Sequence, residues 1–247
     1  MVTMALYNLK GGVGKTAATI NLAYLAAQEG YKTLIWDLDP QGSSSFYLKA
    51  QSAVKNETKK ILSNEIELSE AIQQSDYENL DIIPADISAR YADILLNEMK
   101  QSKKKIASIL STVKKEYDIV LIDCPPGISI LHDTIFAGVD WVLMPNIPTT
   151  LSIRSYESVV EYCKEHGFDI HKFKCFFSMV DHRKNLHHEV MNEFYKDKIF
   201  LKNYIPYLSD VEKMGVQQAP LETFAANSYA AQCFRDLWKE IAHTCID

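Results

Sequence analysis

A glycine-rich segment near the start of the chain, LKGGVGKT at residues 9–16, strongly limits what this sequence can fold into. It follows an apolar run and precedes a stretch with helical period, so it forms the turn between a first strand and a first helix. Glycines let backbone N–H groups turn inward onto phosphate oxygens, a lysine reaches the terminal phosphates, and a hydroxyl binds Mg²⁺. Gly14, Lys15 and Thr16 supply these groups, and the helix directs its positive end at them. The segment predicts a phosphate-binding loop.

Apolar runs of strand length alternate with stretches of helical length and period along the chain. The predicted strands cover residues 2–8, 31–36, 80–84, 118–123, 140–146, 174–180 and 202–207. The predicted helices cover residues 16–29, 90–116, 152–165, 185–195, 209–216 and 227–242. Residues 51–60 are polar and aperiodic, which predicts a surface loop outside the core. The order predicts a single α/β domain over residues 1–247, with three layers and a mostly parallel central sheet flanked by helices.

Composition excludes several classes of protein. The five cysteines are scattered without a C-x-x-C pair, which argues against a disulfide framework or a zinc site. No apolar run approaches the ~18 residues of a membrane span, and we expect a cytoplasmic protein. The net charge of −6 argues against a broad nucleic-acid footprint. A local patch is still compatible, because residues 171–202 hold seven lysines and arginines against four acids and are locally +3.

Aspartates follow two further predicted strands, at the carboxyl ends where parallel sheets bind their ligands. We expect the Thr16 hydroxyl to be a direct Mg²⁺ ligand, and Asp123 to hold a metal-bound water because Mg²⁺ keeps much of its hydration shell. Asp37 and Asp39 are two residues apart in an extended segment, so both carboxylates project to the same side. An alternative for Asp37 is that it caps the turn at residues 40–42.

The phosphate-binding loop departs from the common pattern, because G-x-x-x-x-G-K-S/T requires glycine where this chain has Leu9. The sequence K-G-G-x-G-K-T, which begins at Lys10, resembles the deviant Walker A motif of the ParA/MinD family of partition and positioning ATPases. Three later segments resemble further motifs of the family in the same order, namely DLDPQG at 37–42, VLIDCPP at 120–126 and IPYLSDVEK at 205–213. The resemblance implies a P-loop NTPase fold of ParA/MinD type over residues 1–247, which hydrolyses ATP with Mg²⁺.

The resemblance also implies roles for single residues. Lys10 crosses a face-to-face homodimer and touches the phosphates of the ATP held by the partner, as an arginine finger would. Asp39 positions the attacking water, and Asp37 supports the Mg²⁺ shell. The implied catalytic residues are Lys10, Lys15 and Asp39. The implied metal residues are Thr16, Asp37 and Asp123. The implied nucleotide-binding residues are Lys10, Gly11, Gly12, Val13, Gly14, Lys15, Thr16, Ala17, Asp181, Pro206 and Asp210.

The adenine side follows the family less closely. Pro206 is expected beside the adenine ring, with Asp181 and Asp210 nearby. Family members often have asparagine on the strand that corresponds to residues 175–181, whereas this chain has Ser178 there. The contact with the edge of the base is therefore open.

The family implies an ATPase that dimerises with ATP, binds DNA without sequence preference in that state, and segregates or positions a cargo. The cargo is a plasmid, a chromosome or a protein organelle such as a carboxysome. The implied partners are a second copy of the chain, nucleoid DNA and an adaptor protein that stimulates the ATPase activity. The candidate DNA contacts are Arg183, Lys184, Lys196, Lys198 and Lys202.

Two alternatives stay open. One is a MinD-like ATPase that associates with membranes, because an apolar stripe at helical spacing lies near the end of the chain, at Phe234, Leu237, Trp238 and Ile241. Acidic residues interrupt the cationic face of this helix, so a helix docked in the core is favoured. The other alternative is a P-loop metabolic ligase of the dethiobiotin type.

Overall fold

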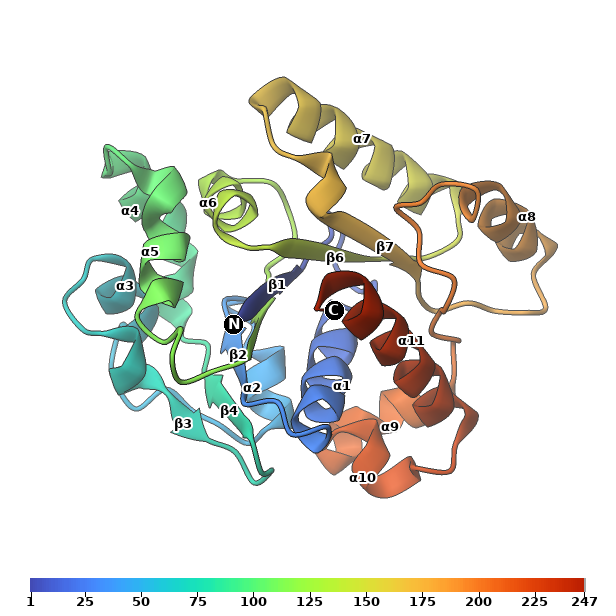
Figure 1. The fold of residues 1–247 in the computed structure, drawn as a ribbon, viewed down its shortest axis with the longest axis horizontal. Helices are drawn as coiled ribbons and strands as arrows, with labels where there is room; N and C mark the ends of the chain where they lie inside the picture. Colours follow the sequence, from blue (N-terminus) through green and yellow to red (C-terminus); the bar gives the residue numbers. More distant parts are fainter. Residues whose placement is uncertain (247) are drawn as a thin grey trace.

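A sheet of seven strands with helices on both faces forms the centre of the computed structural model, which describes residues 1–246 (Figure 1). The strands are β1 Val2–Leu6, β2 Thr33–Asp37, β3 Gln73–Gln74, β4 Leu80–Ile83, β5 Ile119–Asp123, β6 Trp141–Asn146 and β7 Phe173–Phe177. Their order is β3-β4-β2-β5-β1-β6-β7, and every neighbouring pair is parallel except β3 with β4. The predicted fold class, a mostly parallel α/β sheet, is confirmed.

Helices cover both faces of the sheet (Figure 1). The α-helices are α1 Lys15–Gln28, α2 Ser43–Tyr47, α3 Glu57–Leu62, α4 Ala92–Glu98, α5 Lys105–Ser111, α6 Ile130–Gly138, α7 Thr150–His166, α8 Asn185–Phe194, α9 Ser209–Gln217, α10 Leu221–Ala225 and α11 Tyr229–Cys245. The 3₁₀ helices are η1 Leu68–Ala71, η2 Ile87–Tyr91, η3 Ser102–Lys104 and η4 Ile170–Lys172. One apolar cluster lies beneath α3 to α8, and a second lies beneath α1 and α9 to α11. Central strands such as β5 are buried on both faces, which explains their continuous apolar runs.

Two predicted elements are wrong. The single helix predicted over residues 90–116 is divided into η2, α4, η3 and α5. Residues 97–105 contain one apolar side chain, Met99, so no apolar stripe holds a continuous helix against the sheet there. The strand predicted over residues 202–207 is reduced to an isolated bridge between Val180 and Pro206. The Val180 N–H donates to the Ile205 carbonyl at 3.1 Å and the Tyr207 N–H donates to the Val180 carbonyl at 2.9 Å, so this bridge does not need an N–H from Pro206. The pairing is interrupted at Met179, whose φ of 53° lies in the left-handed region and turns the chain after β7.

Seven elements were not predicted from the sequence: the helices α2, α3, α6 and α10, the 3₁₀ helices η1 and η4, and the short edge strand β3. Residues 51–60 are also more ordered than predicted. Helix α3 begins within them at Glu57, and the side chains of Glu57 and Thr58 are buried. The Thr58 N–H donates to the Asp86 carboxylate at 2.9 Å, which connects α3 to the segment that follows β4.

The last helix packs in the core. Phe234, Leu237, Trp238 and Ile241 of α11 are all buried, and α11 lies against α1. The apolar stripe is therefore used in docking the helix, as favoured from the sequence. Across residues 1–246, no helix is both long enough and apolar enough to cross a membrane.

Candidate functional site

The phosphate-binding loop joins the end of β1 to the start of α1, between neighbours β5 and β6 in the sheet. Gly12 and Gly14 have φ angles of 72° and 90°, in the left-handed region where a side chain would be strained. The Lys10 N–H donates to the Asn8 side chain at 2.9 Å, and Asn8 in turn donates to the Pro145 carbonyl at 2.9 Å. The loop thus enters its turn from a fixed position, with its N–H groups at the positive end of α1.

Two adjoining cavities open beside this loop. The first, of about 440 Å³, is lined by Gly11, Gly12, Gly14, Lys15, Thr16, Ala17, Asp39, Gln41, Ser43, Tyr47, Pro126 and Met179. The second, of about 190 Å³, is lined by Gly14, Ala17, Ala18, Tyr47, Phe176, Ser178, Met179, Ile205, Pro206, Tyr207, Leu208, Val211, Glu212 and Phe234. The first is bordered by one cation, Lys15, one carboxylate, Asp39, and the glycine-rich loop, and the second is mostly apolar. The pair suits a ligand with an anionic end and a flat apolar end.

Two buried carboxylates lie side by side beneath the first cavity, because Asp37 and Asp123 are register partners at the ends of β2 and β5. Ser45 donates its N–H and hydroxyl to Asp37 at 2.9 and 2.7 Å, and the Ser44 hydroxyl donates to Asp123 at 2.7 Å. Burial raises the pKa of both carboxyl groups; proximity to Asp123 further raises that of Asp37, and the Ser44 hydrogen bond and the nearby Lys15 ammonium oppose the rise at Asp123.

The residues present fit a magnesium ion. Asp123 Oδ1 is buried and has no hydrogen-bond partner within residues 1–246, although it lies in a site rich in polar groups. A hard divalent cation, bound directly or through a water, would satisfy this oxygen and offset the two adjacent negative charges. Thr16, Asp123 and Asp37 are the oxygen donors placed to hold it. Asp37 also accepts hydrogen bonds from Ser45 at the start of α2. The alternative considered from the sequence, that Asp37 caps the segment after it, therefore describes part of its role.

The two lysines of the loop point to different places. Lys15 is buried, and its Nζ donates to the Lys10 carbonyl at 3.1 Å. Burial lowers the pKa of Lys15, and the Asp123 carboxylate opposes this shift. Lys10 Nζ instead donates to the Leu151 carbonyl at 2.7 Å, at the start of α7. Lys15 therefore serves the cavity of its own chain, while Lys10 lies at an exposed rim.

Asp39 lies over the phosphate-binding loop. Its carboxylate accepts a hydrogen bond from the Gln41 N–H at 2.9 Å, and its own N–H donates to Asp37 at 3.2 Å. Asp39 lines the cavity and is only partly buried, in contrast to the fully buried Asp37. The two aspartates thus face different surroundings, and Asp39 is the one able to meet a water molecule above bound phosphates.

Of the three residues expected near the adenine ring, only one lines a cavity. Pro206 lines the apolar cavity with Met179 and Tyr207. Asp181 lines neither cavity; its carboxylate is held by the Arg183 guanidinium through two contacts of 2.9 Å, which lower its pKa. Asp210 is likewise outside both cavities and pairs with Lys213 at 2.8 Å.

Several residues of the site were missed by sequence reasoning. Tyr47 and Met179 line the cavities, whereas Asn8, Ser44 and Ser45 hold the loop and the two buried carboxylates by hydrogen bonds. Ser44 and Ser45 directly follow the DLDPQG segment, and this position is the signal that could have found them. Ser178 was noticed only as a departure from the family. Its hydroxyl donates to the Val13 carbonyl at 2.6 Å, so it holds the phosphate-binding loop from the apolar cavity.

Replacing Ser178 with alanine is expected to lower the free energy of unfolding by about 1 kcal/mol, because the buried Val13 carbonyl loses its donor. ATP affinity should fall by roughly three- to tenfold, since Val13 lies within the loop. Urea unfolding and nucleotide titration measure both effects. Ser158→Ala is the matched control, because Ser158 makes the same kind of bond, to Arg154, on the exposed side of α7. Equal results for the two variants would show that the Ser178 bond does not position the loop.

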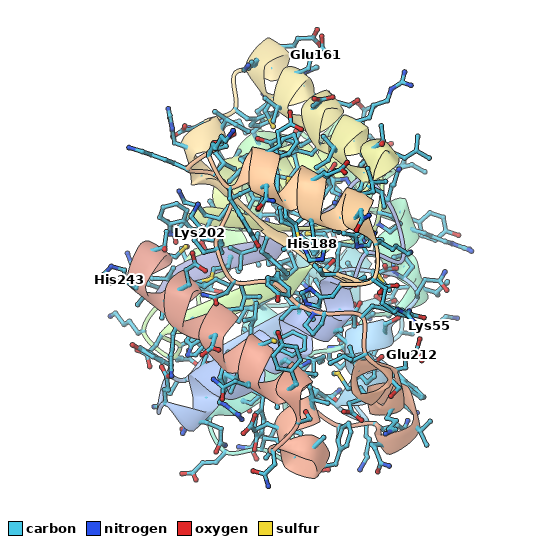
Figure 2. The ribbon with its side chains drawn as sticks, turned by 90° about the vertical axis from the view of Figure 1, so that its right-hand side faces the viewer. Lys55, Glu161, His188, Lys202, Glu212 and His243 are labelled. Carbon is cyan, nitrogen blue, oxygen red and sulfur yellow. The ribbon has the colours of Figure 1, made fainter. Side chains whose placement is uncertain are left out.

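The candidate DNA contacts lie on the side of the molecule that carries α8 (Figure 2). Arg183 is bound to Asp181, and Lys202 donates to the Tyr195 carbonyl while its ammonium lies 5.1 Å from the Tyr195 ring centroid. The three other candidates are exposed and take no part in an ion pair within residues 1–246: Lys184, Lys196 and Lys198.

Known proteins share this sequence pattern and this geometry. Residues 1–171 match the AAA_31 family model, described as AAA domain. The chain is 30% identical over 247 residues to the sporulation initiation inhibitor protein Soj of Bacillus subtilis, with 97% of each chain covered. The chain belongs to the ParA/MinD family. Members of the ParA/MinD family are P-loop ATPases, in agreement with the phosphate-binding loop of this chain.

Two solved structures share the fold of this ParA/MinD chain. A plasmid partition protein of Borrelia burgdorferi bound to AMPPNP has a TM-score of 0.85 at 18% identity, covering 98% of this chain and 99% of that one. Apo McdA of Cyanothece has a TM-score of 0.84 at 20% identity, with 98% and 99% covered. At these identities the likeness concerns the fold alone.

Proposed function

We propose that this chain is an ATPase that dimerises with ATP, binds DNA without sequence preference in that state, and segregates or positions a cargo. The observation that carries the proposal is the separation of the two loop lysines. Lys15 is buried in the site, whereas Lys10 Nζ is held 2.7 Å from the Leu151 carbonyl at an exposed rim. The different positions of the two ammonium groups support a separate task for Lys10, which we assign to the ATP of a second copy.

The residues divide the reaction among them. The loop N–H groups and Lys15 bind the β- and γ-phosphates, and the apolar cavity with Pro206 holds the adenine ring. Mg²⁺ held by Thr16, Asp123 and Asp37 would neutralise charge on the phosphates. Asp39 orients the attacking water. Lys10 of a second copy offsets the charge that develops on the transferred phosphoryl group. The reaction is the hydrolysis of ATP to ADP and phosphate.

The cargo is drawn from what the relatives are named for. A relative in Treponema pallidum is named chromosome-partitioning ATPase Soj and the Borrelia protein is named for plasmid partition, so a plasmid or a chromosome is the first choice. A protein organelle such as a carboxysome is the second. We infer an adaptor on the cargo that stimulates hydrolysis, and association with the nucleoid while ATP is bound. Co-purification with the ATP-bound form would identify the adaptor.

Of the two alternatives, the membrane-associated one is disfavoured by the structure, because the apolar stripe of α11, including Trp238, is already buried against α1. No feature of the site favours a metabolic ligase.

DNA binding is expected to depend on ATP, because dimerisation places two copies of the locally +3 segment 171–202 on one body and so doubles the phosphate contacts. Mobility shift on arbitrary duplex DNA, with ATP, with ADP and without nucleotide, tests this. The double variant Arg183→Ala/Lys184→Ala should bind at least about tenfold more weakly with ATP and show a shallower salt dependence. The control Lys239→Ala removes an exposed lysine of α11 and should bind normally. Equal binding in all three nucleotide states would exclude the coupling.

A further inference from the structure

A second basic segment lies outside the nucleotide site and outside residues 171–202. Residues 100–115 contain six lysines and no acid, so this short stretch carries +6 in a chain whose net charge is −6. It comprises η3, α5 and the turn after α5, on the face that also carries α4 and α6 (Figure 1). We call it the lysine segment. Its members are Lys100, Lys103, Lys104, Lys105, Lys114 and Lys115.

The charge of the lysine segment is only partly offset by neighbouring acids, of which Asp81 and Glu116 line the same cavity as Lys115. All of its lysines except Lys105 are exposed, and within residues 1–246 none of the six takes part in an ion pair. Lys105 donates to the Asn64 side chain, and Lys103 lies 4.8 Å from the ring centroid of Phe168. Both contacts hold a cation in place without supplying a negative charge.

The stability of the fold does not explain this arrangement. Lys103, Lys104 and Lys105 stand at the amino end of α5, where the helix dipole is positive and cations are unfavourable. The first turn of α5 contains no acidic residue to offset them. Lysines this close in sequence also repel one another. A binding partner that brings negative charge would remove both costs.

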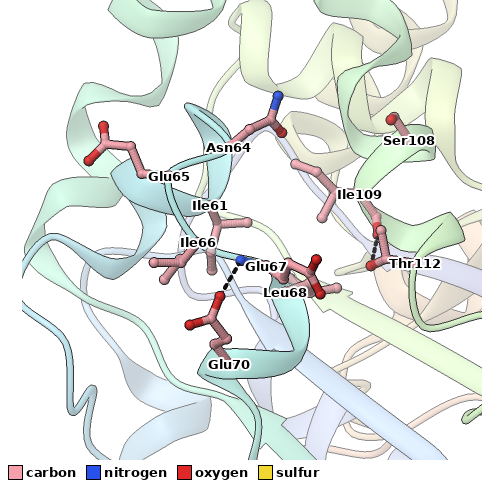
Figure 3. Close-up of a pocket in the computed structure, with 10 residues that line it drawn as sticks. All are labelled: Ile61, Asn64, Glu65, Ile66, Glu67, Leu68, Glu70, Ser108, Ile109 and Thr112. Atoms are coloured by element: carbon pink, nitrogen blue, oxygen red, sulfur yellow. Dashed lines mark hydrogen bonds between the residues drawn. The ribbon is translucent and has the colours of Figure 1, made fainter.

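The neighbouring acids lie beside the lysine segment and do not cover it. Glu98 and Glu116 flank it in the sequence. Glu65, Glu67 and Glu70 border a cavity of about 330 Å³ between α3, η1 and the side of α5 that presents Ser108 and Thr112 (Figure 3). Glu70 there accepts the Glu67 N–H at 2.8 Å, as a helix cap. The three glutamates at this cavity lie on one side of the lysine segment, so an anionic partner would approach the segment from the other side.

The chemistry of the surface selects the class of partner. The large apolar side chains that are exposed in this chain all lie outside residues 100–115, so the segment has nothing to insert into a bilayer. Its exposed residues are lysines with polar neighbours, and lysine is a flexible point charge that suits phosphate without demanding a fixed geometry. A nucleic-acid backbone presents a regular row of such phosphates.

The lysine segment lies far from the phosphate-binding loop along the strands. Lys115 lines a cavity with Lys32 and Asn79, which directly precede β2 and β4. An added Cβ on Gly138, the last residue of α6, would meet the Ala107 nitrogen of α5 at 2.9 Å, and β6 begins soon after Gly138. The segment thus lies at the edge where strands begin, and the nucleotide site lies where β1, β2 and β5 end.

We propose that the lysine segment is a second nucleic-acid surface, which contacts the phosphate backbone of duplex DNA independently of ATP. This inference rests on the proposed function, because it takes DNA as the partner. It adds basal DNA binding that does not need ATP, and the ATP-dependent surface around Arg183 increases the affinity when ATP is bound. Because the segment lies away from the loop that binds ATP, dimerisation neither creates it nor covers it.

The test uses the triple variant Lys100→Gln/Lys104→Gln/Lys114→Gln, which removes three exposed cations and leaves the contacts of Lys103 and Lys105 in place. Its control is Lys55→Gln/Lys59→Gln/Lys239→Gln, three exposed lysines outside both surfaces, which gives the same net charge. Fluorescence anisotropy with arbitrary duplex DNA is measured at about 50 mM salt, without nucleotide, with ADP and with ATP. The triple variant should lose about tenfold or more of the nucleotide-free affinity, and its salt slope should fall by up to about 3, while the control keeps both.

The outcomes separate this inference from the proposed function. Wild-type binding that occurs only with ATP would overturn the lysine surface and leave the proposed function standing. Nucleotide-free binding that is lost in the triple variant, with no increase on adding ATP, would support the surface and overturn the coupling. Equal losses in the triple variant and the control would reduce the effect to net charge and overturn the surface. Binding to vesicles of anionic lipid, lost in the triple variant and without DNA binding, would overturn the choice of nucleic acid.

Discussion

Replacing Asp39 with alanine is expected to slow ATP hydrolysis by about 100-fold or more while ATP affinity changes little. Asp39 lines the cavity over the phosphate-binding loop, and the phosphates are held by other groups, namely the loop N–H groups and Lys15. Loss of a carboxylate that positions and deprotonates the attacking water typically costs this much in rate. Phosphate release under saturating ATP measures the rate, and titration with a fluorescent ATP analogue measures the affinity.

The Asp39 variant should also accumulate as the ATP-bound dimer, because hydrolysis is the step that releases it. Asp76→Ala is the control, since Asp76 is an exposed acid whose only recorded ion pair within residues 1–246 is with Lys49, away from the site. A variant that hydrolyses ATP at the wild-type rate would exclude Asp39 as the catalytic carboxylate. A variant that loses ATP affinity would instead place Asp39 in the binding of the phosphates or the metal.

Much of the fold follows from local pattern. The strand-to-helix turn at residues 9–16 and the apolar run of β5 are each determined by neighbours in the sequence, and both lie where predicted. Prediction failed where local pattern and packing disagree. Residues 90–116 have the composition of one helix, yet the polar stretch around Lys103 offers nothing to bury, so the chain breaks there. The apolar run at residues 202–207 reads as a strand, but the left-handed Met179, with a φ of 53°, interrupts the segment it would pair with and leaves one bridge at Pro206.

The residues of the candidate site also fall into those that the sequence predicts and those that it does not. Glycines, lysines and aspartates beside strand ends are visible in the sequence because their spacing along the chain is itself the signal. Ser44 and Ser178 are not, because each acts across the fold: Ser44 bonds Asp123, 79 residues away, and Ser178 bonds Val13, 165 residues away. The sequence alone does not show which buried oxygen needs a hydrogen-bond donor. Asp181 and Asp210, the two candidates that line neither cavity, have nearby basic partners that occupy their carboxylates.

Replacing Lys10 with alanine is expected to leave ATP bound to a monomer. In this structure the Lys10 ammonium is satisfied by a single backbone carbonyl, that of Leu151, at an exposed rim. Exchanging this contact for the triphosphate of a second copy adds a charge-assisted contact, and close charged pairs across interfaces often change affinity by a factor of roughly 100. The dimer dissociation constant with ATP should rise by about that factor, as measured by light scattering or sedimentation. Affinity of the monomer for ATP should change little, because Lys15 and the loop N–H groups are unaltered.

Two further variants make the Lys10 result specific. Lys15→Ala should lose ATP affinity itself and therefore fail to dimerise for a different reason, which nucleotide titration separates from the Lys10 effect. Lys49→Ala, at an exposed lysine whose recorded partner is Asp76, should dimerise normally. A wild-type protein that remains monomeric at saturating ATP would remove the dimer from the proposed function. A Lys10 variant that dimerises as tightly as the wild type would limit the role of Lys10 to its contact with α7. Other residues of the rim would then have to stabilise the dimer that doubles the number of DNA contacts.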